Sequence, residues 1–194
     1  NGNESSMCGN GGRCIAAFAH KLGVFEKTAS FLAIDGPHEA KVKKKNWVEL
    51  KMKEVNKVVQ NKDHFVLDTG SPHYITFVKN ADKIDVNKEG SAIRYNSTFK
   101  KEGINVNFVE KLKKGIKVVT YERGVENETL SCGTGVTAAA IAFALKQKDA
   151  SKFKIPIISK GGNLELKFEK KGSLFKNIWL CGPATYVFSG FFEK

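Results

Sequence analysis

The hydrophobic and polar positions along the chain mostly alternate with the period of two that indicates short strands. Turn segments such as DTGSPH, NKEG and KGGN separate the alternating stretches. In KVKKKNWVELKMK, lysines partly alternate with apolar residues, as in strands with one face toward water. The predicted strands are Trp47–Met52, His64–Asp68, Tyr74–Val78, Asn105–Val109, Ile116–Glu122, Leu164–Glu169 and Ile178–Leu180.

Two alanine-rich apolar stretches, Cys14–Gly23 and Thr137–Gln147, depart from this alternation and predict helices. The second contains AAAIAFAL, which is apolar on every side and is therefore typical of a buried helix. Two helices among many strands indicate an α+β fold. We expect each helix to be wrapped by its own β-sheet or barrel.

A nine-residue motif recurs ahead of both helices, as NESSMCGNG (Asn3–Gly11) and NETLSCGTG (Asn127–Gly135). Both copies read N-E-[ST]-x-x-C-G-x-G, and agreement of this length with similar sequels indicates two copies of one structural unit. We expect two pseudo-symmetric domains, the first within residues 1–56 and the second within residues 57–181.

The two copies of the motif differ in the length of chain before them. Several predicted strands precede Cys132, whereas only seven residues precede Cys8. If the copies are equivalent, the first domain lacks a counterpart of those strands. We therefore hypothesise that the chain is a fragment of a protein about 60 residues longer at its N-terminus, which an intact mass of the source protein would test.

The net charge of +12 comes almost wholly from lysine, and the only arginines are Arg13, Arg94 and Arg123. Since arginine is preferred where planar anions are bound, this charge favours a solvated lysine surface over a nucleic-acid interface. No apolar run approaches the roughly 20 residues that cross a bilayer, so no membrane partner is expected.

The four cysteines, Cys8, Cys14, Cys132 and Cys181, are too few to form a disulfide framework in a chain of this length. A reduced, cytoplasmic protein is therefore expected. Cys8, Cys14 and His20 lie six residues apart, and this spacing would point them in different directions on a helix, so no metal site is predicted. Cys14 and Cys181 stand outside the repeat and are interpreted as small packing residues.

Each motif cysteine, Cys8 and Cys132, is expected at a helix N-terminus. There the helix dipole lowers the pKa of a thiol, and free backbone amides bind a carboxylate. Two such sulfurs on opposite sides of one carbon could invert a stereocentre, one removing a proton and the other delivering one. Nothing in the chain requires pyridoxal phosphate or any other cofactor. A thiol redox protein with a switchable disulfide is the alternative from another class.

The segments ESSMCGNGGRC, ERGVENETLSCGTG and GPATYVF resemble the diaminopimelate epimerase family, and the similarity covers essentially the whole chain. The resemblance implies a cofactor-independent epimerase that interconverts L,L- and meso-diaminopimelate for lysine and peptidoglycan precursors. It also implies that residues 182–194 return to the first domain. Proline racemases share the two-cysteine plan but typically carry histidine where Asn10 stands, and they remain the alternative within the fold.

At the reacting end of the substrate, the resemblance makes Cys8 and Cys132 the acid/base pair. The helix starts Gly9–Asn10 and Gly133–Thr134 match the groups that hold the reacting carboxylate. Glu122 matches the carboxylate that receives the reacting ammonium group.

At the distal end, Arg123 matches the arginine that binds the second carboxylate, and Asn105 matches an amide ligand beside it. His73 matches a histidine near the reacting centre. Ser71 departs from the family, which usually has asparagine there, so one substrate hydrogen bond is altered or lost. In the family, an N-terminal segment carries further substrate-binding asparagine and glutamine residues, so the hypothesised fragment lacks part of the substrate site and is not expected to be fully active. The expected partner is a small-molecule substrate, and a homodimer is the one assembly that we consider.

Overall fold

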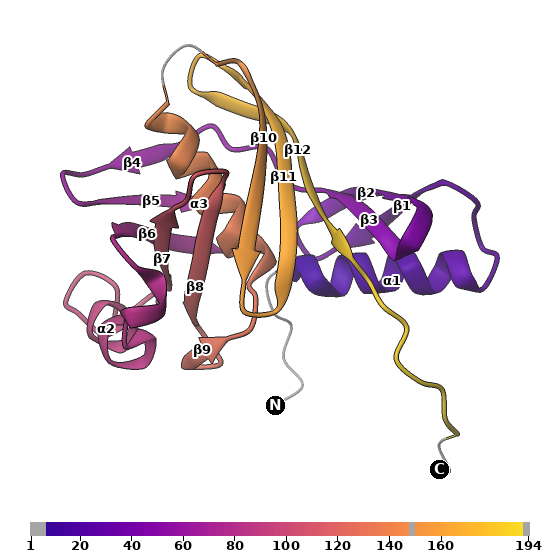
Figure 1. Cartoon of the computed structure of the whole chain (residues 1–194), viewed down its shortest axis with the longest axis horizontal. Helices are drawn as coiled ribbons and strands as arrows, with labels where there is room; N and C mark the ends of the chain where they lie inside the picture. The colour runs from indigo at the N-terminus through magenta and orange to yellow at the C-terminus, as the bar shows by residue number, and fades with distance from the viewer. Residues whose placement is uncertain (1–6, 148–149, 192–194) are drawn as a thin grey trace.

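The structure is a computed structural model that describes residues 7–147 and 150–191. Within these residues the chain forms three α-helices, two short 3₁₀ helices and twelve strands (Figure 1). The helices are α1 (Gly9–Lys21), η1 (Lys44–Asn46), η2 (Ala81–Lys83), α2 (Val86–Arg94) and α3 (Gly133–Leu145). The strands are β1 (Thr28–Ala33), β2 (Gly36–Val42), β3 (Trp47–Lys51), β4 (Val58–Gln60), β5 (His64–Asp68), β6 (Pro72–Val78), β7 (Asn105–Lys111), β8 (Ile116–Glu122), β9 (Asn127–Thr129), β10 (Lys152–Ser159), β11 (Gly162–Lys171) and β12 (Leu174–Pro183).

The strands of the described chain join in one sheet with the order β1-β2-β3-β12-β11-β10-β8-β7-β6-β5-β4, and β9 pairs with β8. The β6–β7 and β8–β10 pairs are parallel, and the other pairs are antiparallel. All seven predicted strands are present, which confirms the α+β class. Five further strands of the described chain were not predicted from the sequence: β1, β2, β4, β9 and β10. In β10, Pro156 argues against a strand in the sequence, yet it takes an exposed position in an unbroken alternation of buried and exposed residues.

The sheet joins two groups of elements through one antiparallel ladder between β3 and β12 (Figure 1). On one side of β12 lie α1 and β1–β3, and on the other side lie α2, α3 and the remaining strands. Gly182 pairs with Val48, and the Ala184 amide donates to the Asn46 carbonyl over 2.9 Å, so the chain after β11 runs back to the first group. Residues 192–194 of the predicted returning segment, and Asn3–Ser6 of the first motif, lie outside the described residues. The domain boundary after residue 56 stays a prediction.

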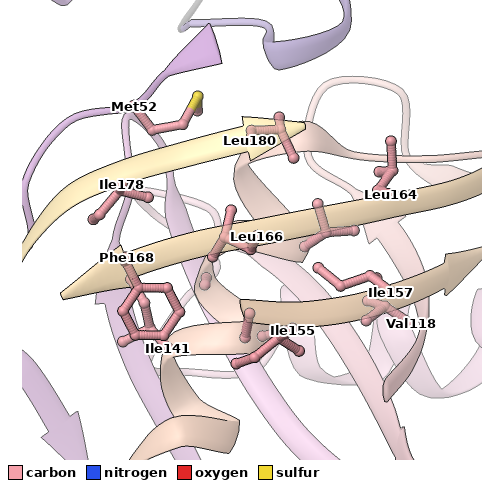
Figure 2. Packing of buried hydrophobic residues seen from close by; sticks show 14 of the residues in the cluster. Met52, Val118, Ile141, Ile155, Ile157, Leu164, Leu166, Phe168, Ile178 and Leu180 are labelled. Carbon is pink, nitrogen blue, oxygen red and sulfur yellow. The ribbon is translucent and has the colours of Figure 1, made fainter. Parts of the chain in front are cut away.

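Helix α3 is the buried helix that the apolar sequence predicts, with twelve of its thirteen residues buried. Ile141 is fully buried, and it packs in a cluster with side chains of β8 and β10–β12 (Figure 2). Burial of one such side chain contributes about 1.5–3 kcal/mol to the free energy of unfolding. The sheet therefore wraps α3 and holds its N-terminus in a fixed position.

Helix α1 follows the first motif as predicted but packs differently. Only Gly9, Gly12, Arg13 and Ala16 are buried in this helix, whereas Ile15 and Phe18 expose more than half of their surface. No helix in the described ranges is both long enough and apolar enough to span a membrane.

The N-termini of α1 and α3 meet backbone to backbone at Gly9 and Gly133. A Cβ on Gly133 would lie 2.8 Å from the Gly9 Cα, and a Cβ on Gly9 would lie 3.1 Å from the Gly133 Cα. Only glycine permits this approach, which explains the first glycine of each motif. The contact brings Cys8 and Cys132, the residues just before the two helices, to the same place.

Candidate active site

A cavity of about 250 Å³ lies where the two helix N-termini meet. Ten of the eleven site residues predicted from the sequence line it, and His73 is the exception. Met7 and Ser131 also line the cavity, although the sequence analysis did not single them out. The lining residues are Met7, Cys8, Gly9, Asn10, Ser71, Asn105, Glu122, Arg123, Ser131, Cys132, Gly133 and Thr134.

Cys8 is exposed and serves as the N-cap residue of α1. Its Sγ accepts a hydrogen bond from the Gly11 amide over 3.3 Å. The sulfur therefore lies at the positive end of the helix dipole.

Cys132 is the N-cap residue of α3, but only 8% of its surface is exposed. Burial raises the pKa of its thiol to about 11, and the opposing effects of the Thr134 hydroxyl and the nearby Gly135 amide do not reverse this shift. Glu122 and Cys8 raise the pKa further. The expectation that a helix start lowers the pKa of both thiols is thus wrong for Cys132, because desolvation of the thiolate outweighs the helix dipole. Cys132 is a neutral thiol near pH 7.

Asn10 links the two motifs through its side chain. Its Nδ2 donates to the Ser131 carbonyl over 2.9 Å, and its Oδ1 accepts from Arg13 Nη2 over 2.8 Å. These two partners fix which way the amide points. Arg13 is itself buried, so one of the three arginines positions a cavity residue instead of facing solvent.

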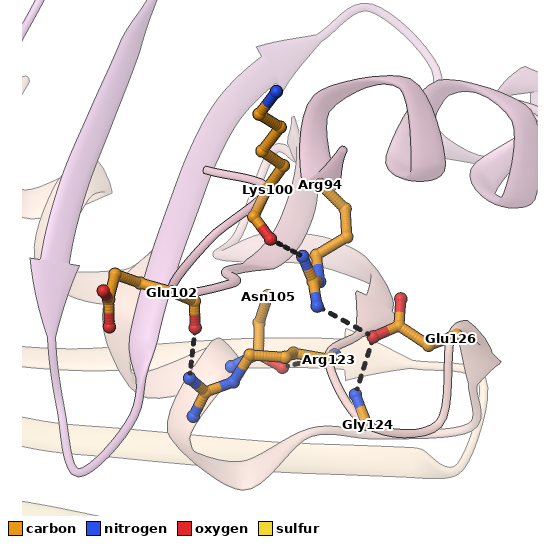
Figure 3. A network of polar contacts seen from close by, with 7 residues as sticks. All are labelled: Arg94, Lys100, Glu102, Asn105, Arg123, Gly124 and Glu126. Carbon is orange, nitrogen blue, oxygen red and sulfur yellow. Dashed lines mark hydrogen bonds and ion pairs between the residues drawn. The ribbon is translucent and has the colours of Figure 1, made fainter. Parts of the chain in front are cut away.

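The distal part of the cavity is formed by Asn105, Ser71 and Arg123. Asn105 Nδ2 donates to Ser71 Oγ over 2.9 Å and to the Pro72 carbonyl over 3.0 Å, and its Oδ1 accepts from the Arg123 amide over 2.9 Å. Arg123 Nη2 lies 3.4 Å from the same Ser71 hydroxyl. Figure 3 shows the other contact of this guanidinium, in which Nη1 donates to the Glu102 carbonyl over 3.0 Å. The hydroxyl of Ser71 therefore bridges the two groups predicted to bind the distal carboxylate.

The turn that carries Arg123 is fixed from outside the cavity by Arg94 (Figure 3). Arg94 pairs with Glu126 over 3.3 Å and donates to the Lys100 carbonyl over 3.4 Å. Glu126 also accepts from the Gly124 amide over 3.1 Å. These contacts hold the backbone on both sides of the β8–β9 turn.

Glu122 ends β8 at the cavity wall, and its Oε2 accepts from Thr129 Oγ1 over 2.8 Å. No ion pair joins Glu122 to Arg123 among the described residues, so each is available to a ligand group of opposite charge.

His73 is fully buried behind the cavity wall and contacts Thr134 instead of lining the cavity. Burial, with a smaller contribution from Arg123, lowers the pKa of His73 to about 3, so the imidazole is neutral near pH 7. Its other neighbour, Asn107, was missed in the sequence analysis. The signal was the pattern INVNF, in which two asparagines two apart share one face of a strand that is otherwise apolar.

All four cysteines are free thiols. Within residues 7–147 and 150–191, no three His, Cys, Asp or Glu side chains come together in a way that could hold a metal ion. The groups that meet in the cavity are thus two thiols, helix-start amides, one carboxylate and one guanidinium. Such a set can bind a small zwitterion and exchange a proton with it.

Comparison with known proteins identifies the same family as the sequence motifs. The family model described as diaminopimelate epimerase matches residues 65–187. The chain is 46% identical over 188 residues to a diaminopimelate epimerase of Flavobacterium psychrophilum, covering 96% of this chain and 73% of that protein. It is 40% identical over 202 residues to a diaminopimelate epimerase of a Hydrogenobaculum species, covering 97% of this chain and 71% of that protein.

Two solved structures share the fold at low sequence identity. A phenazine biosynthesis protein of the PhzF family from Bacillus anthracis has a TM-score of 0.69 at 14% identity and covers 94% of this chain and 74% of that one. A hydroxyproline epimerase from Agrobacterium vitis, solved with bound trans-4-hydroxy-L-proline, has a TM-score of 0.64 at 12% identity and covers 92% and 65%. At these identities the likeness concerns the fold alone.

Proposed function

The chain belongs to the diaminopimelate epimerase family, and from this premise we propose that it interconverts L,L- and meso-diaminopimelate without a cofactor. The observation that carries the proposal is the placement of Cys8 and Cys132. They precede two helices whose first residues touch, and both line one cavity with the groups expected to bind the substrate.

The reaction needs one sulfur as base and the other as acid. In the proposed step, a thiolate takes the α-proton and becomes a thiol, while the facing thiol delivers its proton to the opposite side of the carbon and becomes a thiolate. In the unliganded protein the raised pKa of Cys132 makes it the thiol of this pair. The reverse reaction exchanges the two roles.

The weak acidity of an amino-acid α-carbon is the main barrier to this step. We assign the reacting carboxylate to the amides at the starts of α1 and α3, where two helix dipoles stabilise the negative charge that develops on it. We assign the reacting ammonium group to Glu122. A substrate that fills this cavity of about 250 Å³ displaces water from it, which strengthens both interactions.

The distal end of the substrate is assigned to Arg123 and Asn105. Arg123 presents a guanidinium held by Ser71 and the Glu102 carbonyl, and such a fixed planar group suits a carboxylate. A substrate with two carboxylates uses both ends of the cavity. Proline has a single carboxylate, which the reacting end binds, so it has no second one for Arg123.

The wider proposals follow from the reaction. A diaminopimelate epimerase serves lysine and peptidoglycan precursor synthesis, and free catalytic thiols suit the reducing cytoplasm. We also propose the two-domain division after residue 56, with the cavity between the two domains. A homodimer remains a prediction, which a sedimentation measurement would test.

Incorporation of solvent deuterium tests the mechanism. With the full-length protein and L,L-diaminopimelate in D₂O, we expect deuterium at the α-carbon, and we expect Cys8→Ala and Cys132→Ala to lose the exchange by about 10³-fold or more. Cys14→Ala is the matched control, because Cys14 is exposed and lies outside the cavity. Exchange that survives in either active-site variant would exclude the two-thiol mechanism.

The same assay separates the alternatives. A panel that includes proline and hydroxyproline distinguishes a related racemase from a diaminopimelate epimerase. Activity that requires an oxidised Cys8–Cys132 pair, and is lost with reductant, would favour the thiol redox protein.

A further inference from the structure

We propose that Asn107 is a positioning residue that holds His73 in its Nε2–H tautomer, so that the Thr134 hydroxyl hydrogen stays directed at Cys132 Sγ. The four side chains form a continuous buried chain that runs from Asn107 and His73, behind the cavity wall, to Thr134 and Cys132, which line the cavity. The inference deepens the proposed function and rests on it only for its catalytic consequence; the hydrogen-bond order itself can be measured independently.

The orientation of the Asn107 amide is fixed by partners of known polarity. Its Nδ2 lies 3.1 Å from the Tyr74 carbonyl, which can only accept. Its Oδ1 accepts from Thr120 Oγ1 over 2.9 Å. Asn107 is fully buried, so water cannot replace either partner. The amide nitrogen must therefore face His73.

This orientation selects one tautomer of His73. Asn107 Nδ2 lies 3.1 Å from His73 Nδ1, and because Nδ2 is a donor, Nδ1 must accept. The neutral imidazole then carries its single hydrogen on Nε2, which lies 2.9 Å from Thr134 Oγ1 and donates to it. In a buried neutral ring, the hydrogen bond at one nitrogen fixes the role of the other.

Thr134 continues the direction of these hydrogen bonds from His73 to the sulfur of Cys132. Its Oγ1 accepts from His73, so its own hydrogen is free to point elsewhere, and Cys132 Sγ lies 3.5 Å away. A hydroxyl that donates to sulfur stabilises the thiolate more than the thiol. In the other tautomer, His73 Nε2 would accept from the same hydroxyl and draw its hydrogen away from Cys132.

The second glycine of the motif permits this arrangement. A Cβ on Gly135 would lie 2.4 Å from Asn107 Oδ1, so only glycine lets the first turn of α3 rest on Asn107. The charged neighbours are also defined: Arg123 acts on His73, while Glu122 and Cys8 act on Cys132. Cys8 Sγ faces the Gly11 amide instead, so the two sulfurs receive different donors.

The first test uses the wild-type chain and NMR of its histidine side-chain nitrogens. We expect His73 to show an unprotonated Nδ1 and a protonated Nε2 at pH 7. A protonated Nδ1 would overturn the proposal without any variant.

The second test compares Asn107→Leu with Asn163→Leu, the same exchange at an exposed position of β11. In Asn107→Leu we expect the single Nε2–H signal to be lost and alkylation of Cys132, measured by peptide mass spectrometry, to slow about tenfold. Cys8 in the same sample should keep its rate, as should both cysteines in Asn163→Leu. An unchanged Cys132 rate in a folded Asn107→Leu protein would refute the proposal.

If Asn107→Leu does not fold, Thr134→Ser and Thr134→Val test the last link. The serine variant keeps the hydroxyl, so the alkylation rate of Cys132 should not change. In the valine variant this rate should fall about tenfold. Equal rates in the two variants would contradict the proposed donor. Failure of the deuterium assay together with the expected tautomer and rates would remove the proposed function and leave this hydrogen-bond order standing.

Discussion

The two copies of the motif have nearly the same sequence, but the fold gives them different surroundings. Cys8 is exposed on a helix with one buried side, whereas Cys132 is buried on a helix that the sheet encloses. The Gly11 amide contacts the first sulfur, and a chain of buried polar side chains ends at the second. The comparison teaches that the motif determines where a thiol is placed, while the surrounding structure determines its protonation.

The largest expected effect is a loss of folding stability in acid, caused by His73 in the buried chain that ends at Cys132. Because the pKa of His73 is about 3 in the folded protein and near 6.5 when unfolded, the unfolded chain binds its proton first as the pH falls. The contribution of neutral His73 to stability is complete above about pH 6.5 and is lost toward pH 3, by up to about 5 kcal/mol. Urea unfolding of wild type and His73→Asn at several pH values measures this contribution. Parallel pH dependence in the two proteins would contradict it.

The same substitution in the two helices should have unequal costs. Ile141 in α3 is fully buried and Ile15 in α1 is 57% exposed. We expect Ile141→Ala to lower the free energy of unfolding by about 2–5 kcal/mol, because it leaves a cavity in the core. Ile15→Ala should cost about 1 kcal/mol or less. Denaturant unfolding of the pair checks this, and equal costs would show that α1 is packed as tightly as α3.

Thiol labelling compares the reactivity of Cys8 and Cys132 directly. At pH 8 we expect Cys132 to react with iodoacetamide at least about tenfold more slowly than Cys8, because Cys132 is buried and its pKa is about 11. Its rate should rise about tenfold per pH unit between pH 8 and 10, as the thiolate fraction grows. If the reaction rate of Cys132 with iodoacetamide no longer rises above pH 8, the pKa of this thiol is not raised.

The smallest expected effect concerns Ser71, which lines the distal part of the cavity that the two motifs share. Ser71→Ala removes the hydroxyl that accepts from Asn105 and lies beside Arg123. We expect diaminopimelate binding to weaken by about 1 kcal/mol, or about fivefold in Kd, through loss of alignment at the distal end. Calorimetric titration measures this, and Ser91→Ala is the control, because Ser91 is a half-buried residue of α2 that does not line the cavity.

The repeat carried most of the prediction of the site. Both helices begin directly after the motif cysteines, and six of the ten predicted residues that line the cavity belong to the repeat, because a duplicated sequence with small residues constrains backbone approach strongly. The other four were predicted from the family resemblance alone; they are Ser71, Asn105, Glu122 and Arg123. The position of His73 could not be predicted in the same way. Whether a polar side chain in a strand faces a cavity or lies behind its wall depends on the pairing of β6 with β7, which joins residues 32 positions apart.

Helix α2 and the protonation of Cys132 could not be predicted from the sequence. Helix α2 is short and contains Gly90, which weakens a helical pattern, yet that glycine fits directly against Tyr121, where a Cβ would lie 2.4 Å from the ring side chain. The raised pKa of Cys132 could not be predicted from the sequence either. The motif indicates a helix start and its dipole, but it does not indicate how deeply the thiol is buried. Both cases depend on packing between segments far apart in the chain.

The contact between Gly9 and Gly133 has a consequence for redesign of this protein. Since the two helices touch through main-chain atoms, the spacing of the residues before them does not depend on the side chains that form the rest of the cavity. The wall formed by Ser71, Asn105 and Arg123 could therefore be exchanged to accept other amino acids while the paired thiols keep their separation. A single architecture could in this way yield isomerases of many specificities, each reusing the same proton-transfer unit.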